Sequence, residues 1–144
     1  MSVQQVHQTL QRYVEALLAR GDYGRFFARD MQFAVMGTDQ QTRGAEAAEQ
    51  AIRFLHETAF DAKPEIINLL ADEHGAAAEA VFVGTHTGEF AGIKASGGAV
   101  RVPYSVFYEL EGDKITALRI YLPMEQLVAQ IRDPTQAGVA SSAP

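Results

Sequence analysis

The segment from residue 81 to residue 122 carries the pattern that most restricts how this chain can fold. Between Val100 and Leu110 every second residue is apolar, and polar residues such as Arg101 and Glu109 lie among those in between. This alternation is typical of a β-strand with one face in the core, because successive side chains of a strand point to opposite faces. The short link Gly112-Asp113 predicts a tight turn to the next strand. We therefore expect an antiparallel sheet with one apolar face.

Helical periodicity precedes this sheet. Apolar residues between Val6 and Leu18, and again between Ala45 and Phe60, recur at spacings of three and four, which predicts two amphipathic helices. Asp22 is placed to cap a second, short helix between them. We expect strands over residues 31–36, 65–72, 76–90, 98–111 and 114–122, and a last short helix over residues 124–131.

Helices followed by closely linked strands predict an α+β domain, in which the N-terminal helices cover one face of a curved antiparallel sheet. A pocket can form between these layers. The 144 residues fit one domain, which we place over residues 1–132. Residues 133–144 are small and polar, so we expect a disordered C-terminal tail.

Composition excludes several classes of partner and cofactor. The formal net charge is −6 and the 12 Lys and Arg residues are scattered, which argues against a nucleic-acid partner. There is no cysteine, so disulfides and thiolate chemistry are excluded. The four histidines show no metal-ligand spacing and no glycine-rich nucleotide loop occurs, so we expect neither a metal nor a cofactor. Without a signal peptide or a membrane-length apolar run, we expect a cytoplasmic protein that does not bind membranes.

The other face of the predicted sheet is half apolar. Val81, Val83, Phe107 and Tyr121 fall on the odd-numbered side of their strands, beside charged residues such as Arg119. Apolar sheet faces of this kind usually pack against a partner. We therefore expect a homodimer that associates through the sheet.

Three motifs carry a resemblance to a known family. They are Gly84-Thr85-His86-Thr87-Gly88, Val100-Arg101-Val102-Pro103 and Gly112-Asp113-Lys114-Ile115. With this order of elements, residues 6–131 resemble the SnoaL-like polyketide cyclases, which belong to the nuclear-transport-factor-like superfamily of cone-shaped α+β domains. The opening helix is also similar to that of the ketosteroid isomerases in this superfamily. The resemblance implies a deep pocket at the wide end of the cone.

The resemblance also implies catalytic positions, and this sequence departs from them. The acid/base Asp and the His of the aldol-type cyclases correspond to Ile120 and Val106, which cannot move a proton. In the isomerases the base corresponds to the region of Val35, while the oxyanion tyrosine matches Tyr13. The epoxide hydrolases of the superfamily place a carboxylate where this chain has His86. The usual carboxylate machinery is therefore replaced.

Four residues remain as candidates for catalysis. His86 lies by parity on the apolar face, and an imidazole can accept or donate a proton near neutral pH. Tyr104 lies on the same face and could donate a hydrogen bond to a carbonyl or enolate oxygen, as could Tyr13. Asp39, in a loop at the predicted rim, could orient His86 or contact the ligand. The structural alternatives are a hydrogen-bonded core histidine, packing tyrosines and an exposed turn aspartate.

Two functions stay open at this point. The first is a cofactor-independent cyclase, isomerase or lyase for a small, mostly hydrophobic carbonyl compound, in which His86 shuttles a proton and Tyr104 and Tyr13 hold the oxyanion. The second is a non-catalytic binding or carrier protein for a hydrophobic metabolite, favoured by the replaced catalytic positions. In both cases the predicted pocket walls are Val35, Phe82, Val102, Val106, Tyr108, Ile120 and Leu122.

Overall fold

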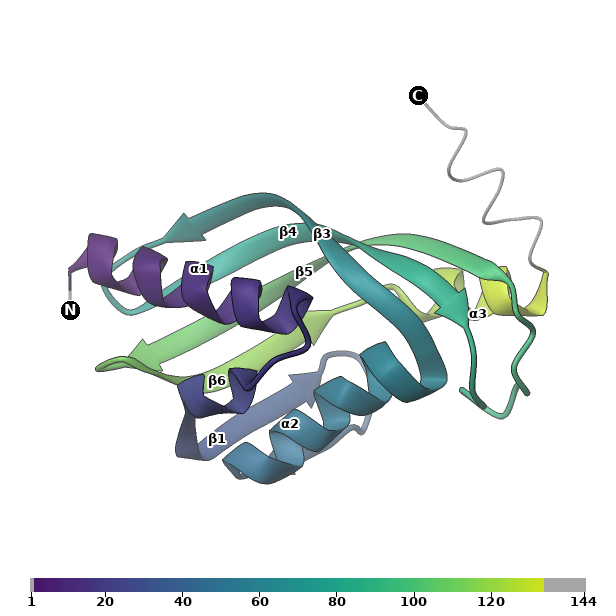
Figure 1. Ribbon diagram of the computed structural model, residues 1–144, viewed down its shortest axis with the longest axis horizontal. Helices are drawn as coiled ribbons and strands as arrows, with labels where there is room; N and C mark the ends of the chain where they lie inside the picture. Colours follow the sequence, from purple (N-terminus) through teal and green to yellow (C-terminus); the bar gives the residue numbers. More distant parts are fainter. Residues whose placement is uncertain (1, 134–144) are drawn as a thin grey trace.

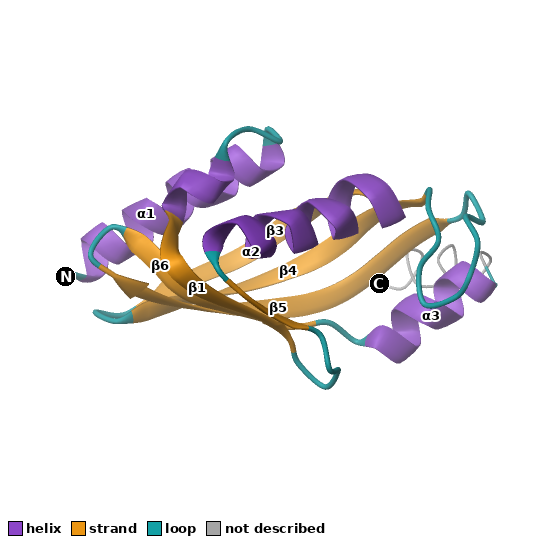
Figure 2. Cartoon of the chain, turned by 90° about the horizontal axis from the view of Figure 1, so that it is seen from below, coloured by secondary structure: helices purple, strands orange, loops and turns teal. Residues whose placement is uncertain are grey.

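The computed structural model describes residues 2–133, as a curved six-stranded sheet with helices against it (Figure 1). Helices α1 (Val3–Leu18) and α2 (Ala45–Arg53) lie on the same side of the sheet (Figure 2). The short helix α3 (Met124–Arg132) lies at one end, along β5. The predicted α+β class is confirmed. Of the predicted C-terminal tail, residues 134–144 lie outside the described part of the chain.

The sheet is mixed rather than wholly antiparallel. Its strands stand in the order β2-β1-β6-β5-β4-β3, and β1 runs parallel to β6 while the other neighbours are antiparallel. The strands are β1 (Phe27–Val35), β2 (Gln41–Arg43), β3 (Phe60–Ala71), β4 (Gly75–His86), β5 (Ala99–Glu111) and β6 (Lys114–Tyr121). The parallel pair joins residues at least 85 positions apart in sequence, such as Val35 and Ile120 (120 − 35 = 85), so no local sequence pattern predicts it.

The largest boundary error of the sequence prediction lies at the end of the second helix. After Arg53 the helix continues as one π-helical turn, Phe54–Ala59, hereafter the π-turn. Strand β3 then begins at Phe60, five residues before the predicted start. Pro64 lies inside β3, where it is tolerated because β3 is an edge strand.

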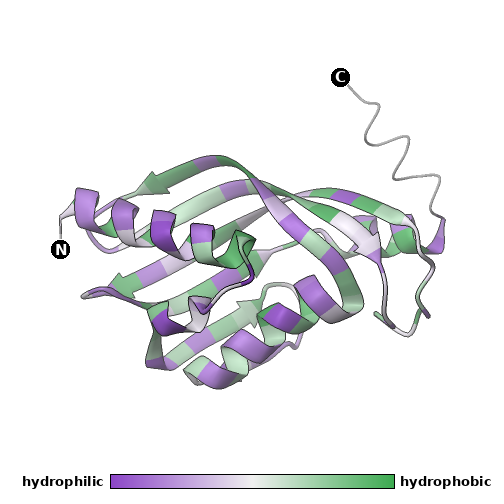
Figure 3. Cartoon of the chain, viewed as in Figure 1, coloured by the Kyte–Doolittle hydropathy of each residue, from purple (hydrophilic) through white to green (hydrophobic). Residues whose placement is uncertain are grey.

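The predicted alternation along β5 is confirmed. Val100, Val102, Val106, Tyr108 and Leu110 are buried against the helices. Figure 3 shows the resulting alternation of hydrophobic and hydrophilic residues along the strands.

The outer face of the sheet is not covered by helix α1 or α2. There Phe107 and Tyr121 are 44% and 43% exposed, and their rings pack edge to face with centroids 5.6 Å apart. Two of the apolar side chains predicted for this face, Phe107 and Tyr121, are therefore exposed to solvent.

Helix α1 lies on the inner face of the sheet, the face covered by the helices, where it contacts β3 and β4. It begins with a capping box between Ser2 and Gln5, which satisfies two otherwise free backbone N–H groups. Its buried side includes Leu10 and Tyr13. No helix within residues 2–133 is long and apolar enough to cross a membrane.

Candidate functional site

An apolar pocket lies between the inner face of the sheet and the helices, hereafter the inner pocket. Its free volume is about 30 Å³, which holds a water molecule or two. A larger ligand therefore enters only if the lining side chains move apart. The lining residues are Tyr13, Val14, Leu17, Ile52, His56, Pro64, Ile66, Ala78, Ala80, Tyr104, Val106, Tyr108, Leu118 and Ile120.

The sequence analysis missed His56, the one residue of this lining that titrates near neutral pH. Its side chain is 6% exposed, and its Nδ1 atom lies 2.8 Å from the carbonyl oxygen of Ile52. The Nε2 atom is buried and has no hydrogen-bond partner within the described residues. Burial lowers the pKa of His56 from its usual value near 6.5, and this effect outweighs the hydrogen bond to Ile52, which raises it. The imidazole is therefore held neutral.

Hydrogen bonds from other parts of the chain hold the backbone of the π-turn, both at His56 and at its last two residues, and so position His56. The guanidinium of Arg20, just after α1, donates to the carbonyl oxygen of His56 at 3.3 Å. At the other end, the backbone N–H groups of Thr87 and Gly88 donate to Ala59, both at 3.0 Å. The Thr87 hydroxyl also donates to a π-turn carbonyl, 3.1 Å away. Residues 87–88 belong to the Gly-Thr-His-Thr-Gly motif, so this motif holds the turn that carries His56.

Three tyrosines supply the other polar groups of the inner pocket. Tyr13 comes from α1, and Tyr104 and Tyr108 come from β5. Burial raises the pKa of all three hydroxyls above the usual value of 10, so they stay protonated at neutral pH. Each can donate a hydrogen bond to a ligand oxygen.

Aromatic contacts join the imidazole to one of these tyrosines. The Phe82 ring lies edge to face with His56 at a centroid distance of 5.5 Å and with Tyr104 at 6.0 Å. Tyr108 and Tyr13 form a separate pair of the same kind, with centroids 5.9 Å apart. Phe82 is fully buried, so it packs between the imidazole and the phenol of Tyr104 in the core.

The structure places His86 at the end of β4, fully buried but outside the lining of the inner pocket. Its Nδ1 atom accepts from the backbone N–H of Ser96 at 3.1 Å and lies 3.0 Å from the Ser96 hydroxyl. Its backbone exchanges hydrogen bonds with Gly97 and Gly98. His86 therefore fastens residues 87–98 to the end of β4.

The remaining predicted residues divide between four places. Tyr13, Tyr104, Val106, Tyr108 and Ile120 meet in the inner pocket. Phe82 and Val102 are buried in the core and do not line this pocket. Val35 and Leu122 line a separate small pocket beside Phe90. Asp39 is exposed in the turn between β1 and β2, and no contact to His86 is present among the described residues.

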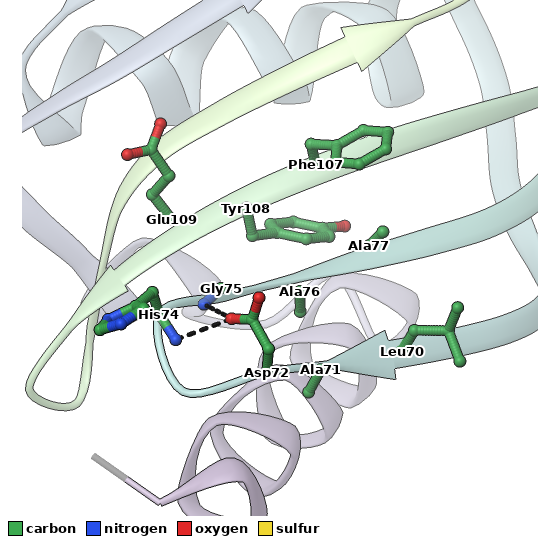
Figure 4. Close-up of a pocket in the computed structure, with 10 residues that line it drawn as sticks. All are labelled: Leu70, Ala71, Asp72, His74, Gly75, Ala76, Ala77, Phe107, Tyr108 and Glu109. Atoms are coloured by element: carbon green, nitrogen blue, oxygen red, sulfur yellow. Dashed lines mark hydrogen bonds between the residues drawn. The ribbon is translucent and has the colours of Figure 1, made fainter.

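A larger hollow on the surface is a poorer candidate. Figure 4 shows it beside the turn between β3 and β4, where Leu70 and Phe107 face solvent. Of its two carboxylates, Glu109 pairs with Arg119, and Asp72 accepts from the backbone N–H groups of His74 and Gly75, both at 2.8 Å. These bonds lower the pKa of Asp72 and stabilise the turn. The carboxylates of this hollow are therefore engaged in contacts within the protein rather than available to a ligand.

The inner pocket carries no formal charge, since its lining includes no Asp, Glu, Lys or Arg. Within residues 2–133, no group of three His, Asp or Glu side chains is close enough together to hold a metal ion. The chemistry available in this pocket is that of one neutral imidazole and three phenols.

The sequence did contain a signal for His56. Ala48, Ile52 and Ala59 mark the buried face of the second helix, and His56 follows Ile52 by four residues, on that same face. The histidine was discounted because it had no partner at metal-ligand spacing, a test that applies to metal sites and not to a lone base in a pocket.

Comparison with known proteins agrees with this architecture. Residues 7–131 match the family of SnoaL-like polyketide cyclases. No curated protein matches the sequence. A protein from Jannaschia sp. CCS1, named as a SnoaL-like polyketide cyclase, has a similar structure with a TM-score of 0.81 at 20% identity, covering 91% of this chain and 94% of that one.

Two further structures show the same fold. One, from Xanthomonas campestris pv. campestris and named as a polyketide cyclase, has a TM-score of 0.79 at 19% identity, covering 90% of this chain and 98% of that one. The other, an LEH-like epoxide hydrolase from M. tuberculosis, has a TM-score of 0.73 at 15% identity, covering 97% and 98%. At these identities the likeness establishes the fold alone.

Proposed function

Because this chain belongs to the SnoaL-like polyketide cyclase family, we propose that it is a cofactor-independent enzyme of the cyclase, isomerase or lyase type. Its substrate is a small, mostly hydrophobic molecule that bears a carbonyl group. The observation that carries this proposal is the composition of the inner pocket, where an imidazole and three phenols stand among apolar walls without any charged side chain.

The phenols suit the stabilisation of an enolate. When a base removes a proton from the carbon beside a carbonyl, negative charge develops on the carbonyl oxygen. A protonated tyrosine can then donate to that oxygen, and the bond is strongest where water is excluded. Tyr104 fits this role best, because it is half-buried and lines the pocket, while its raised pKa keeps the hydroxyl protonated.

The proton-transfer role predicted for His86 has less support than its role in holding the loop. The ring does not line the inner pocket, and its Nδ1 atom is occupied by Ser96. In this proposal His86 and the motif around it act as positioning residues, because Thr87 and Gly88 hold the π-turn at the pocket wall.

A non-catalytic binding protein for a hydrophobic metabolite is the second candidate. It is favoured by Val106 and Ile120, which line the pocket at the positions where aldol-type cyclases carry their acid/base pair. The variant Tyr104→Phe separates the two candidates when turnover and ligand affinity are measured independently. Loss of turnover with affinity retained supports the enzyme, whereas a ligand that binds the wild type and is released unchanged supports the carrier.

We also propose that the chain forms a homodimer through the outer face of the sheet. Phe107 and Tyr121 are exposed there, and ion pairs flank them, between Arg119 and Glu109 and between Arg101 and Glu65. A twofold interface places the same patch on both subunits, so each side offers apolar rings and both signs of charge to the other.

A further inference from the structure

We propose that Nε2 of His56 is the proton-accepting atom of the inner pocket, and that the pocket selects an uncharged molecule presenting an O–H or an acidic C–H to it. This inference deepens the proposed function and rests on it for the pocket, but binding alone can test it. The juxtaposition that carries it is a buried imidazole nitrogen without a hydrogen-bond partner, on a histidine that lines an apolar pocket together with three tyrosines.

The contact with Ile52 determines which nitrogen of His56 carries the proton. A backbone carbonyl oxygen can only accept, so Nδ1, 2.8 Å away from it, must be the donor. In a neutral imidazole the other nitrogen then has a free lone pair. Nε2 is therefore a hydrogen-bond acceptor.

This acceptor is left unsatisfied by the protein. Nε2 is buried and has no partner among the described residues. A buried polar atom without a partner costs about 1–3 kcal/mol. A ligand that donates a hydrogen bond to Nε2 removes this cost, and a ligand of the same shape without a donor does not. The pocket therefore discriminates by the presence of a donor.

The rest of the lining determines the charge and polarity of the ligand. No side chain of the inner pocket carries a formal charge that could pair with a carboxylate, a phosphate or an ammonium group. Burying such an ion without a partner is costly, so the ligand is neutral. The hydroxyls of Tyr13, Tyr104 and Tyr108 can donate to its oxygen.

With a carbonyl substrate the same geometry supports a complete proton transfer. Nε2 takes the proton from the carbon beside the carbonyl, and the electron pair of the broken C–H bond forms a C=C bond while the carbonyl π pair moves to oxygen. Tyr104 donates to this oxygen. The resulting imidazolium keeps its Nδ1–H bond to Ile52. It returns the proton from Nε2 to the same carbon or, where the substrate carries a C=C bond next to that carbon, to the far end of that bond. The oxygen pair then re-forms the carbonyl, the C=C bond shifts accordingly, and the protein is left unchanged.

The π-turn explains why the imidazole is available. Single π-helical turns within helices are rare and frequently occur at functional sites. Here the turn is held by Arg20 at the His56 carbonyl and by Thr87 at its last residues. The position of His56 is thus specified by two segments that lie far from it in sequence.

The test uses the full chain labelled with ¹⁵N and three probes of similar shape. Phenol offers a donor, anisole lacks it, and benzoate carries a charge. We expect the ¹⁵N chemical shift of the free protein to show Nδ1–H and bare Nε2 for His56. Phenol should shift the Nε2 resonance and bind about tenfold more tightly than anisole, the ratio for one net hydrogen bond, and benzoate should not bind there.

Two variants complete the test. His56→Phe keeps an aromatic ring but removes the acceptor, so phenol and anisole should bind it equally. The control His74→Gln changes an exposed histidine outside the inner pocket and should leave the preference intact. Because the tautomer and the Nε2 shift are read in the wild type, the test stands even where His56→Phe fails to fold.

The inference is overturned if Nε2 carries the proton in the free protein, or if phenol and anisole bind the wild type equally. It is supported, and the proposed enzymatic function fails, if phenol shifts Nε2 while a carbonyl ligand that binds the wild type is released unchanged. The two ideas are therefore separable.

Discussion

The Nδ1 atom of His56 lies 2.8 Å from the carbonyl oxygen of Ile52, four residues earlier in the chain. This single contact orients the ring, selects its tautomer and leaves the opposite nitrogen bare at the wall of the inner pocket. Because His56 belongs to the π-turn, a change in the backbone of this turn should alter the orientation of the imidazole in the pocket.

His56 should make stability depend on pH. Its pKa is lower in the folded state than the ordinary 6.5, so the unfolded chain binds more protons below that pH. The contribution is complete above about pH 6.5 and is lost as the pH falls toward the folded-state pKa. Arg20 lowers this pKa further, whereas Glu57 opposes the effect. Denaturant unfolding at several pH values measures the slope.

His56→Gln should flatten that slope between about pH 6.5 and the folded-state pKa, because the titrating group is gone. The control His74→Gln, at an exposed position, should keep the slope of the wild type. Equal slopes in the wild type and His56→Gln would show that another group titrates in this window.

Removing the hydroxyl of Tyr104 should lower turnover, whereas removing the hydroxyl of Tyr23 should affect only the stability of the fold. Tyr104→Phe should lower kcat by about 10²-fold if its hydroxyl stabilises an oxyanion, with little change in unfolding free energy. The Tyr23 hydroxyl is buried and has no partner within the described residues, so Tyr23→Phe should be neutral or stabilising. Turnover and denaturant midpoints of both variants check this pair, and a large loss of stability in Tyr23→Phe would reveal an interaction that the structure lacks.

Gly88 should not tolerate a side chain. A Cβ atom there would overlap the carbonyl oxygen of Thr58 in the π-turn, so Gly88→Ala should destabilise the fold by about 1–3 kcal/mol. The matched control is Gly21→Ala, whose Cβ would meet only Ala16 at an ordinary 3.7 Å. Urea unfolding gives both values. The account of the motif is wrong if the two variants are equally stable.

The outer face of the sheet should control association. Phe107→Glu places a charge in the exposed apolar patch and should turn a dimer into a monomer in light scattering after size exclusion. Met36→Glu, at an exposed position in the β1–β2 turn, should have no effect. A wild type that is monomeric at micromolar concentration would contradict the proposed dimer.

The fold could be read largely from local patterns. Alternation along β5 located the inner face, and it correctly buried Val102, Tyr108 and His86. Whether a strand residue is buried follows from its odd or even position in the strand, which can be read directly from the sequence. The contacts that a buried residue makes cannot be read in this way. His86 meets Ser96 because residues 87–98 fold back over the strand end, and no periodicity encodes that path.

The same reasoning applies to the inner pocket. Tyr104, Tyr108 and Ile120, which the sequence analysis grouped on one face, all line it because they share one face of neighbouring strands. His56 was missed because the helix was expected to continue regularly to Phe60. The π-turn depends on contacts with Arg20 and Thr87, which are distant in sequence and become visible only when the chain is folded.

The most direct test of the whole account is a crystal structure of the full chain with phenol bound. We predict that phenol occupies the inner pocket, with its oxygen within hydrogen-bonding distance of His56 Nε2 and its ring against Tyr104 and Val106. Phenol found beside His86, or only in the surface hollow next to Phe107, would contradict the assignment of the inner pocket as the functional site.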